Sequence, residues 1–389
     1  MICVGVDVAK NKHDIHIWDS ASGEVLLDHL TISNTLNGFS ELTSFLKPFD
    51  IASVYIACEA TGHYHFNFLN FFYNLGFHCA YINPHDVKLY RDFIKKPRVK
   101  NDKIDASVIA QIIPHANLLA YKPLDVHTAE LRYLTRYRTK LISKQTACKI
   151  ELHTLVDSVF PEFHHFFASG IHIQSAYALL SSFPSARSIA SAHLTKLANL
   201  LSFSSKGRFK KDTAISLKSL AQSSIGSSNF ALEFEIQDII EQLRFFHDKI
   251  KQVELKIHEL LLILDSKITT IPGIGPTLSA IIISEIGDIN RFPSPKKLVA
   301  YAGLVPSQYQ SGNFIANNNH LTKQGNKYLR SAIWKAASLI WIHNPTFHDY
   351  YTKKRLQGKH HNVIIGHITK KLCSIIFAVL SKNEPFLLL

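Results

Sequence analysis

The chain opens with three short segments whose apolar and polar positions follow the pattern of β-strands, namely Ile2–Val8, His13–Trp18 and Val25–Ile32. A turn-forming stretch around Ser20–Gly23 joins the second segment to the third, which indicates an antiparallel meander. We therefore expect three antiparallel strands at the start of the chain.

Helical and strand patterns alternate after this meander. The expected elements are a helix near Leu36–Leu46, a strand Ala52–Cys58, a helix from about His63 to Leu75, a strand Phe77–Ile82 and helical stretches on both sides of Lys100. Three antiparallel strands followed by such an alternation is the element order of a ribonuclease-H-like domain, although many α/β folds share parts of it. The pattern predicts an α/β domain over residues 1–120.

Two long helices are expected in the region 121–265. The first spans Ala129–Val156, with an apolar stripe on one side and basic residues on the others: Arg132, Arg136, Lys140, Lys144 and Lys149. In the second, apolar residues from Ile236 to Leu264 recur at alternating steps of three and four, which is the heptad of a coiled coil. The two helices pack as a hairpin within one chain or across a dimer; the alternative is a long helix lying on a globular core.

Between the two long helices, residues 157–230 are rich in Ser, Phe and Ala and predict a small helical insertion. This insertion contains a basic run, Lys206–Lys211, flanked by serines. Such a run is either a solvated surface or a contact for nucleic acid.

A mostly helical C-terminal domain is predicted for residues 266–389. Its first motif, Ile271–Pro276, leads into an apolar helix, Leu278–Ile286, as in a helix-hairpin-helix. Gly273 and Gly275 would permit a tight turn that exposes backbone N–H groups to phosphate. The alternative is a Gly/Pro turn between two packed helices.

Charge is distributed unevenly along the 389 residues, whose formal net charge is +13. Residues 266–389 hold fifteen lysines and arginines against four acidic residues. A basic block of this kind indicates a polyanionic partner, and nucleic acid, such as double-stranded DNA, is the leading candidate. The alternatives are a solvated basic surface or an anionic membrane surface.

The five cysteines are scattered and include no C-x-x-C pair: Cys3, Cys58, Cys79, Cys148 and Cys373. This distribution argues against a zinc site or a disulfide framework and fits a reducing cytosol. The N-terminus lacks a signal-peptide pattern, and no apolar run approaches the length of a membrane span. We expect a cytoplasmic, nucleoid-associated protein with no membrane partner.

Four acidic residues lie at the boundaries of predicted elements. Asp7 ends the first strand, Glu59 directly follows an apolar strand, and Asp102 and Asp105 share one face if their segment is helical. Phosphodiester cleavage needs several converging carboxylates to hold Mg²⁺, and two ions can stabilise both the attacking and the leaving oxygen. The alternative is four ordinary surface acids.

A serine nucleophile is a further possibility in the C-terminal domain. Ser311 precedes a glycine in a predicted loop, and the basic segment that follows carries Lys323, Lys327 and Arg330. Such cations would bind phosphate next to a nucleophile. On these residues alone Ser307 is an equal candidate.

Six stretches together match one known family. They are VGVDVAK at 4–10, CEATGHY at 58–64, KNDKIDA at 100–106, IPGIG at 271–275, AGLVPSQYQSG at 302–312 and LTKQGNKYLR at 321–330. In order and spacing the chain resembles the one-ten family of insertion-sequence transposases. These are also called DEDD transposases or bridge-RNA-guided recombinases, and Piv-type DNA invertases are their relatives. The departure is Asn101, where the family commonly has threonine.

The resemblance implies a RuvC-like domain in which Asp7, Glu59, Asp102 and Asp105 bind Mg²⁺. It implies that Ser311 attacks DNA and forms a transient phosphoserine, which removes the choice with Ser307. It also implies a structured guide RNA as partner and a homo-oligomer, dimer or tetramer, held by the coiled coil.

Three classes of function follow from these observations. The leading interpretation is a transposase that cuts and rejoins DNA through a protein nucleophile. The alternatives are a RuvC-like structure-selective nuclease that uses water, and a non-catalytic binding protein descended from such an enzyme. A covalent protein–DNA adduct distinguishes the first class from the second.

Overall fold

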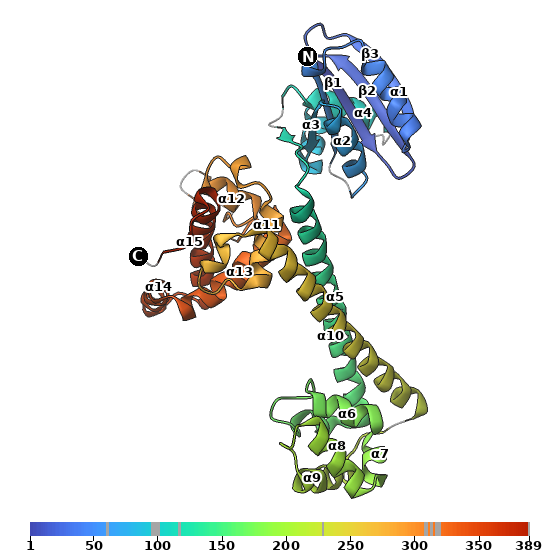
Figure 1. The fold of residues 1–389 in the computed structure, drawn as a ribbon, viewed down its shortest axis with the longest axis vertical. Helices are drawn as coiled ribbons and strands as arrows, with labels where there is room; N and C mark the ends of the chain where they lie inside the picture. The colour runs from blue at the N-terminus through green and yellow to red at the C-terminus, as the bar shows by residue number, and fades with distance from the viewer. Residues whose placement is uncertain are drawn as a thin grey trace. The chain divides into compact units, whose positions relative to one another are not determined.

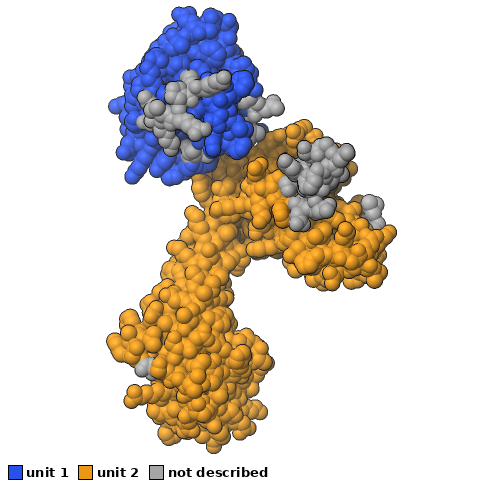
Figure 2. All heavy atoms as spheres, turned by 180° about the vertical axis from the view of Figure 1, so that it is seen from behind, with its two compact units in different colours: residues 1–123 blue, residues 124–389 orange. Residues whose placement is uncertain are grey.

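The computed structural model describes residues 1–59, 62–94, 102–115, 118–227, 229–306, 310–311, 314–315 and 320–387. The chain divides into two compact units, Met1–Pro123 and Leu124–Leu389, which Figure 2 draws in blue and orange. The first unit contains a mixed β-sheet with helices, and the second is mostly helical. The predicted combination of an α/β region with a helical region is therefore confirmed.

The first unit is built on a six-stranded sheet in the order β3-β2-β1-β4-β5-β6 (Figure 1). The strands are β1 (Ile2–Val8), β2 (Lys12–Asp19), β3 (Val25–Ser33), β4 (Val54–Glu59), β5 (His78–Ile82) and β6 (Leu119–Ala120). The first three pair antiparallel, as the meander predicts, and β4 and β5 continue the sheet parallel to β1. No sequence pattern predicted the short edge strand β6, which pairs antiparallel with β5.

Helices cover both faces of this sheet. They are α1 (Leu36–Leu46) and α2 (His65–Asn74) on one face, and α3 (Pro84–Phe93) and α4 (Asp102–Ile112) on the other. The last two are the helical stretches expected around Lys100, although Lys100 and Asn101 themselves lie outside the described residues. Alternation along β1 explains the two layers, since Val4 and Val6 face α1 and α2 while Cys3 faces α3 and α4.

Helix α4 lies unusually close to β1. A Cβ atom on Gly5 would stand 2.2 Å from the carbonyl oxygen of Ala106 and from the amide nitrogen of Ala110. Only glycine leaves room for this approach, so Gly5 allows the backbone of α4 to lie directly over β1, the strand that carries Asp7.

In the second unit, α5 (Val126–Val159) and α10 (Phe230–Leu264) run antiparallel and side by side (Figure 1). The start of α5 and the end of α10 share one hydrophobic cluster, which includes Leu131 and Ile257. The end of α5 and the start of α10 share another. The two predicted long helices thus pair within one chain, and pairing between chains stays a prediction.

The predicted helical insertion has a hydrophobic core of its own. Its elements are a short 3₁₀ turn (Pro161–His165), α6 (Gln174–Ser182), α7 (Ala186–Ser191), α8 (Leu194–Ser204) and α9 (Lys211–Gln222). Buried side chains such as Phe163, Leu180, Leu197 and Leu217 pack there against the ends of α5 and α10.

The C-terminal part of the second unit is a cluster of helices with one small hairpin. Its elements are α11 (Pro276–Ile286), α12 (Pro295–Tyr301), β7 (Gln310–Ser311), β8 (Phe314–Ile315), α13 (Lys327–His343), α14 (Pro345–Leu356) and α15 (His361–Lys382), with 3₁₀ turns at Lys267–Thr270 and Ile289–Arg291.

Among the described residues, α15 is the one helix long and apolar enough to cross a membrane by length and composition, which the sequence analysis did not anticipate. Its apolar residues are not exposed as a continuous surface. Ile364, Ile368, Leu372 and Ile376 are fully buried in the same core as α11 and α13. The helix is apolar because it is a core helix of this unit.

Candidate active site

Asp7 and Glu59 lie side by side at one edge of the sheet. The parallel register pairs Val6 of β1 with Cys58 of β4, so Asp7 and Glu59 occupy the next position on neighbouring strands. Strands in a sheet are about 4.8 Å apart, and residues in register point to the same face. Both side chains are partly exposed, as befits a strand end.

Electrostatics also connects these two acids. Burial raises the pKa of the Cys58 thiol, and the neighbouring Cys79, Glu59 and Asp7 raise that pKa further. The thiol is therefore neutral and unreactive at physiological pH. Because both carboxylates raise the pKa of the same thiol, both lie near Cys58.

Helix α4 carries the other two acids over this face. Asp105 precedes Ala106, whose backbone touches Gly5 two residues before Asp7. Asp102 is the first residue of α4, but its side chain lies outside the described part of the chain. The Asp105 carboxylate forms an ion pair with Arg91 of α3, and both side chains are about four-fifths buried.

A metal site needs at least three converging ligands. Among the described side chains, no group of three His, Cys, Asp or Glu residues lies close enough to hold a metal ion. The structure thus brings Asp7 and Glu59 together and places Asp105 against Arg91. Convergence of all four acids stays a prediction.

Asp14, an acid that no sequence pattern indicated, pairs directly with Asp7 across β1 and β2. Its carboxylate accepts hydrogen bonds from Thr31 Oγ1 at 2.5 Å and His29 Nε2 at 2.9 Å, and forms an ion pair with Lys12 Nζ at 3.1 Å. Burial alone would raise the pKa of the Asp14 carboxyl, but these three interactions outweigh burial and lower it. In the sequence, Asp14 is simply one polar position of an alternating strand.

The two glycines of the predicted helix-hairpin-helix differ in their surroundings. Gly273 has a φ of +82°, and a Cβ there would come within 3.0 Å of the Ile340 amide nitrogen in α13. Gly275 caps the start of α11 and has open space around its Cβ position. Gly273 therefore serves packing between helices, whereas the N-terminus of α11 at Gly275 is the part of the motif that is open to a ligand.

Ser311 lies in the β7–β8 hairpin, where it pairs with Phe314. Its side chain is not among the described atoms, and Ser307, the other candidate, lies outside the described residues. Two backbone contacts close the base of the loop that carries this hairpin: the bridge between Pro306 and Leu321, and the hydrogen bond from the Thr322 amide to the Val305 carbonyl at 2.9 Å.

The three predicted phosphate-binding cations lie at the base of the same loop. Arg330 Nη1 donates to the carbonyl oxygens of Ala302 at 3.2 Å and Lys323 at 3.0 Å, so it ties the two ends of the loop together. Lys323 itself has a φ of +54°. Lys327 begins α13, with its ammonium group over the Tyr328 ring. Arg330 thus has a structural role, and its role in binding phosphate stays a prediction.

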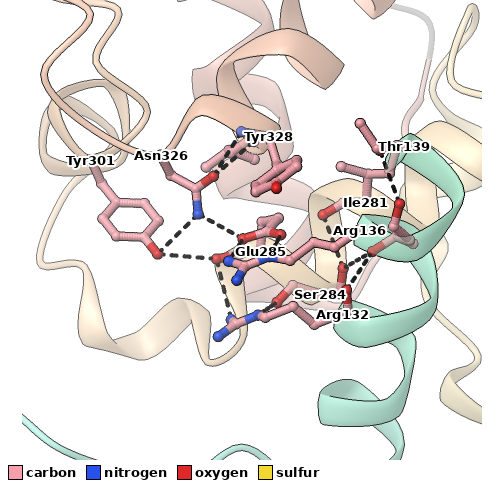
Figure 3. Close-up of polar contacts among 11 residues, drawn as sticks. Arg132, Arg136, Thr139, Ile281, Ser284, Glu285, Tyr301, Asn326 and Tyr328 are labelled. Carbon is pink, nitrogen blue, oxygen red and sulfur yellow. Dashed lines mark hydrogen bonds and ion pairs between the residues drawn. The ribbon is translucent and has the colours of Figure 1, made fainter. Parts of the chain in front are cut away.

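A buried carboxylate that the sequence did not indicate lies next to the two ends of this loop (Figure 3). Glu285 of α11 is fully buried, and Arg136 of α5 binds it with two hydrogen bonds of 2.7 and 2.8 Å. Asn326, which caps α13, donates a third at 2.7 Å. The hydrogen bonds with Glu285 raise the pKa of the Arg136 guanidinium. Because 149 residues separate the two charged partners, no local pattern indicates the pair.

Comparison with known proteins bears directly on this arrangement. A family model described as a transposase of the DEDD IS110 type matches residues 4–161, and one described as "Transposase IS116/IS110/IS902 family" matches residues 265–352. The first match covers the unit with the four acids, and the second covers the loop with Ser311.

Individual relatives agree with the family models. The 43.6 kDa protein of insertion element IS110 from Streptomyces coelicolor is 25% identical over 72% of this chain and 70% of its own length. The transposase for insertion sequence element IS1111A from Coxiella burnetii is 22% identical over 85% of this chain and 78% of its own. The pilin gene-inverting protein of Moraxella bovis is 33% identical over 38% of this chain, and the match spans about half of that protein, 48%.

The two family models and the relatives define a transposase, an enzyme that moves an insertion sequence by recombination. More specifically, the chain belongs to the IS110 family of transposases, as its motifs indicated.

Proposed function

We propose that this transposase cuts and rejoins DNA through a serine–phosphate ester. The carboxylates of Asp7, Glu59, Asp102 and Asp105 act together with Ser311. The placement of Asp7 and Glu59 at adjacent strand ends is the observation that carries the proposal, because it sets two like charges at one edge of the sheet.

The acids of the first unit suit a magnesium site. Carboxylate oxygens are the ligands that Mg²⁺ prefers, and adjacent carboxylates repel each other unless a cation lies between them. The strand order, with an antiparallel meander followed by parallel strands, supports a RuvC-like fold for this unit. Bound Mg²⁺, as one ion or two, would stabilise the charge that develops on the phosphate oxygens and on the leaving oxygen.

In the proposed reaction the Ser311 hydroxyl loses its proton and its oxygen bonds to phosphorus, while the bond from phosphorus to the 3′ oxygen breaks. The 3′ oxygen leaves as a hydroxyl, and the phosphate stays on the serine as an ester. Attack by a different 3′ hydroxyl reverses these steps and joins a new strand without an external energy source. Lys323, Lys327 and Arg330, at the base of the loop, would neutralise the phosphate.

The proposal extends to partners. Ser311 and the four acids belong to different compact units, which is compatible with a site assembled between two chains of a dimer or tetramer. The basic residues of α5 and of the C-terminal part offer a large positive surface for DNA and for a guide RNA. The sequence contains no zinc-finger or basic-zipper motif that would read DNA bases. Base pairing between such an RNA and the DNA would supply that recognition.

Trapping on a suicide DNA substrate tests the proposal. Wild-type protein should form a covalent adduct that protease removes, Ser311→Ala should form none, and Ser307→Ala should form it at the wild-type rate. If Ser311→Ala cleaves DNA at close to the wild-type rate, water is the nucleophile and the nuclease alternative replaces the proposal.

A further inference from the structure

Glu285 is the point where three parts of the second unit meet (Figure 3). Its Oε1 accepts from Arg136 Nε at 2.7 Å, and its Oε2 accepts from both Arg136 Nη2 and Asn326 Nδ2 at 2.8 and 2.7 Å. The side chain has no exposed surface. A buried carboxylate tolerates little movement, because each lost hydrogen bond leaves charge without compensation in a medium of low dielectric constant.

The helix that carries Glu285 is clamped to α5 by a second arginine. Arg132 Nε donates to the Ser284 carbonyl oxygen at 2.7 Å, and its Nη2 donates to the Glu285 carbonyl oxygen at 3.4 Å. These carbonyls belong to the last turn of α11, whose orphan acceptors need donors from outside the helix. Together with Arg136, this fixes the end of α11 against α5.

Both ends of the loop that carries Ser311 form hydrogen bonds with Glu285. Tyr301 ends α12, where the loop begins, and Asn326 lies where the loop ends. The backbone N–H of Asn326 donates to the Tyr301 carbonyl oxygen at 2.8 Å, and the Tyr301 hydroxyl donates to the backbone carbonyl oxygen of Glu285 at 3.3 Å.

Asn326 can make these contacts in only one orientation. Its Oδ1 accepts from the backbone amides of Tyr328 and Leu329, both at 3.0 Å, so its Nδ2 must face Glu285. The carboxylate of Glu285 thereby fixes the helix cap at which the loop ends.

We propose that Glu285 is a positioning residue for strand transfer: it holds the two ends of the Ser311 loop at a fixed separation, and Arg136 makes that separation depend on α5. This rests on the proposed role of Ser311 as the nucleophile. A displacement of about 1 Å at a reacting group can cost about 10²-fold in rate, so loosening the base of this loop should slow the chemical step without weakening DNA binding.

Glu285→Gln is the most informative substitution, because the amide has nearly the same shape. Arg136 and Asn326 present donors to both oxygens, so the new NH₂ group must face a donor wherever it is placed. At least one hydrogen bond is lost, which weakens the link of Glu285 to α5 or to the loop.

The experiment measures single-turnover formation of the covalent adduct, DNA affinity and the Mg²⁺ concentration for half-maximal rate. Glu285→Gln should slow adduct formation about 10–100-fold, while DNA affinity and Mg²⁺ dependence stay close to those of wild type, because the substitution touches neither DNA nor the four acids. Glu254→Gln is the matched control. It makes the same change in the acid of another ion pair, with Arg138 at 2.6 Å, that joins the same α5 to α10, so its rate should stay within about threefold of wild type.

Asn326→Ser covers the case in which Glu285→Gln fails to fold. Serine also caps helices, so α13 keeps its N-cap while the hydrogen bond to Glu285 is lost. This variant should fold and should slow adduct formation as Glu285→Gln does. A wild-type rate in a folded Asn326→Ser protein overturns the positioning role.

Hydrogen exchange separates failure of this inference from failure of the proposed nucleophile. In Glu285→Gln and in Asn326→Ser, the amides of Gly303, Leu304 and Thr322 at the loop base should exchange faster, while those of α10 keep wild-type protection. If wild-type protein forms no adduct, the role of Ser311 is wrong, and exchange still reports whether Glu285 holds the loop. Unchanged exchange at the loop base overturns the inference.

Discussion

Two sets of carboxylates in this chain differ in their surroundings. Asp7 and Glu59 lie next to each other at strand ends and are partly exposed. Glu285 is fully buried, and three hydrogen bonds from a cation and an amide compensate its charge. Adjacent like charges attract a divalent cation, whereas a buried acid that already has its donors stabilises one local arrangement. Asp7 and Glu59 therefore suit the metal site proposed above, whereas Glu285 stabilises the contact of α11 with α5 and with Asn326.

The largest expected effect is loss of cleavage when a strand-end acid is neutralised. Asp7→Asn should reduce single-turnover strand cleavage about 10³-fold or more, because one ligand for the cation that stabilises the transition state is removed.

Glu41→Gln provides the control, because Glu41 is an exposed acid on α1, which covers the other face of the sheet. That variant should cleave at the wild-type rate. A cleavage rate for Asp7→Asn equal to that of Glu41→Gln would remove Asp7 from the active site.

Removing the counterion of Glu285 should produce the largest loss of stability. Arg136→Ala leaves a buried carboxylate without its cation, which costs about 3–5 kcal/mol. Chemical denaturation monitored in the second unit measures this. Arg138→Ala breaks a pair on the same helix whose acid, Glu254, is 37% exposed, so the carboxylate left behind can be hydrated and the cost should be about 0–1 kcal/mol. Equal losses for the two variants would mean that Glu285 does not depend on its ion pair.

The smallest effect concerns Asp14, the acid that pairs with Asp7 across the strands. Hydrogen bonds keep its pKa below the usual range, so the folded state holds the ionised form more tightly than the unfolded chain does. The resulting stability is present above the unfolded pKa of about 3.9 and is lost as pH falls through the folded pKa. Asp14→Asn should lower the stability of the first unit by about 1 kcal/mol at neutral pH.

Below about pH 4 the difference in stability between wild type and Asp14→Asn should shrink as pH falls, and it should vanish below the folded pKa of Asp14. Denaturation curves at pH 7 and pH 3 check this. A constant difference between the two proteins at both values would show that the carboxylate itself contributes nothing.

The sequence predicted elements whose signal is local. The alternation in β1 to β3 and the heptad in α10 each arise because one face of the element is buried along its whole length, so the pattern repeats within a short window. For the same reason Asp7 and Glu59 were recognisable as residues at strand ends. The two-residue strand β6, Leu119–Ala120, is too short to carry any period.

Features that depend on distant partners left no local signal. Arg136 looks like one of several basic residues on a long helix, and Glu285 interrupts an apolar run without any motif around it. Their pairing follows only from the way α11 packs on α5. Gly273 was predicted to help expose backbone N–H groups to phosphate. It also lies so close to the backbone of Ile340 that a larger residue would not fit easily, and sequence spacing does not reveal this contact.

The close approach of α4 to Gly5 makes the Gly5 codon sensitive to point mutation. Glycine codons begin with two guanines, and every change of either base replaces glycine by a larger residue or by a stop. Any such residue would place a Cβ 2.2 Å from backbone atoms of α4 and lift the helix that carries Asp102 and Asp105. If α4 carries two acids of the proposed site, a single base change at this codon should inactivate a copy of the transposase while its four acidic codons remain intact.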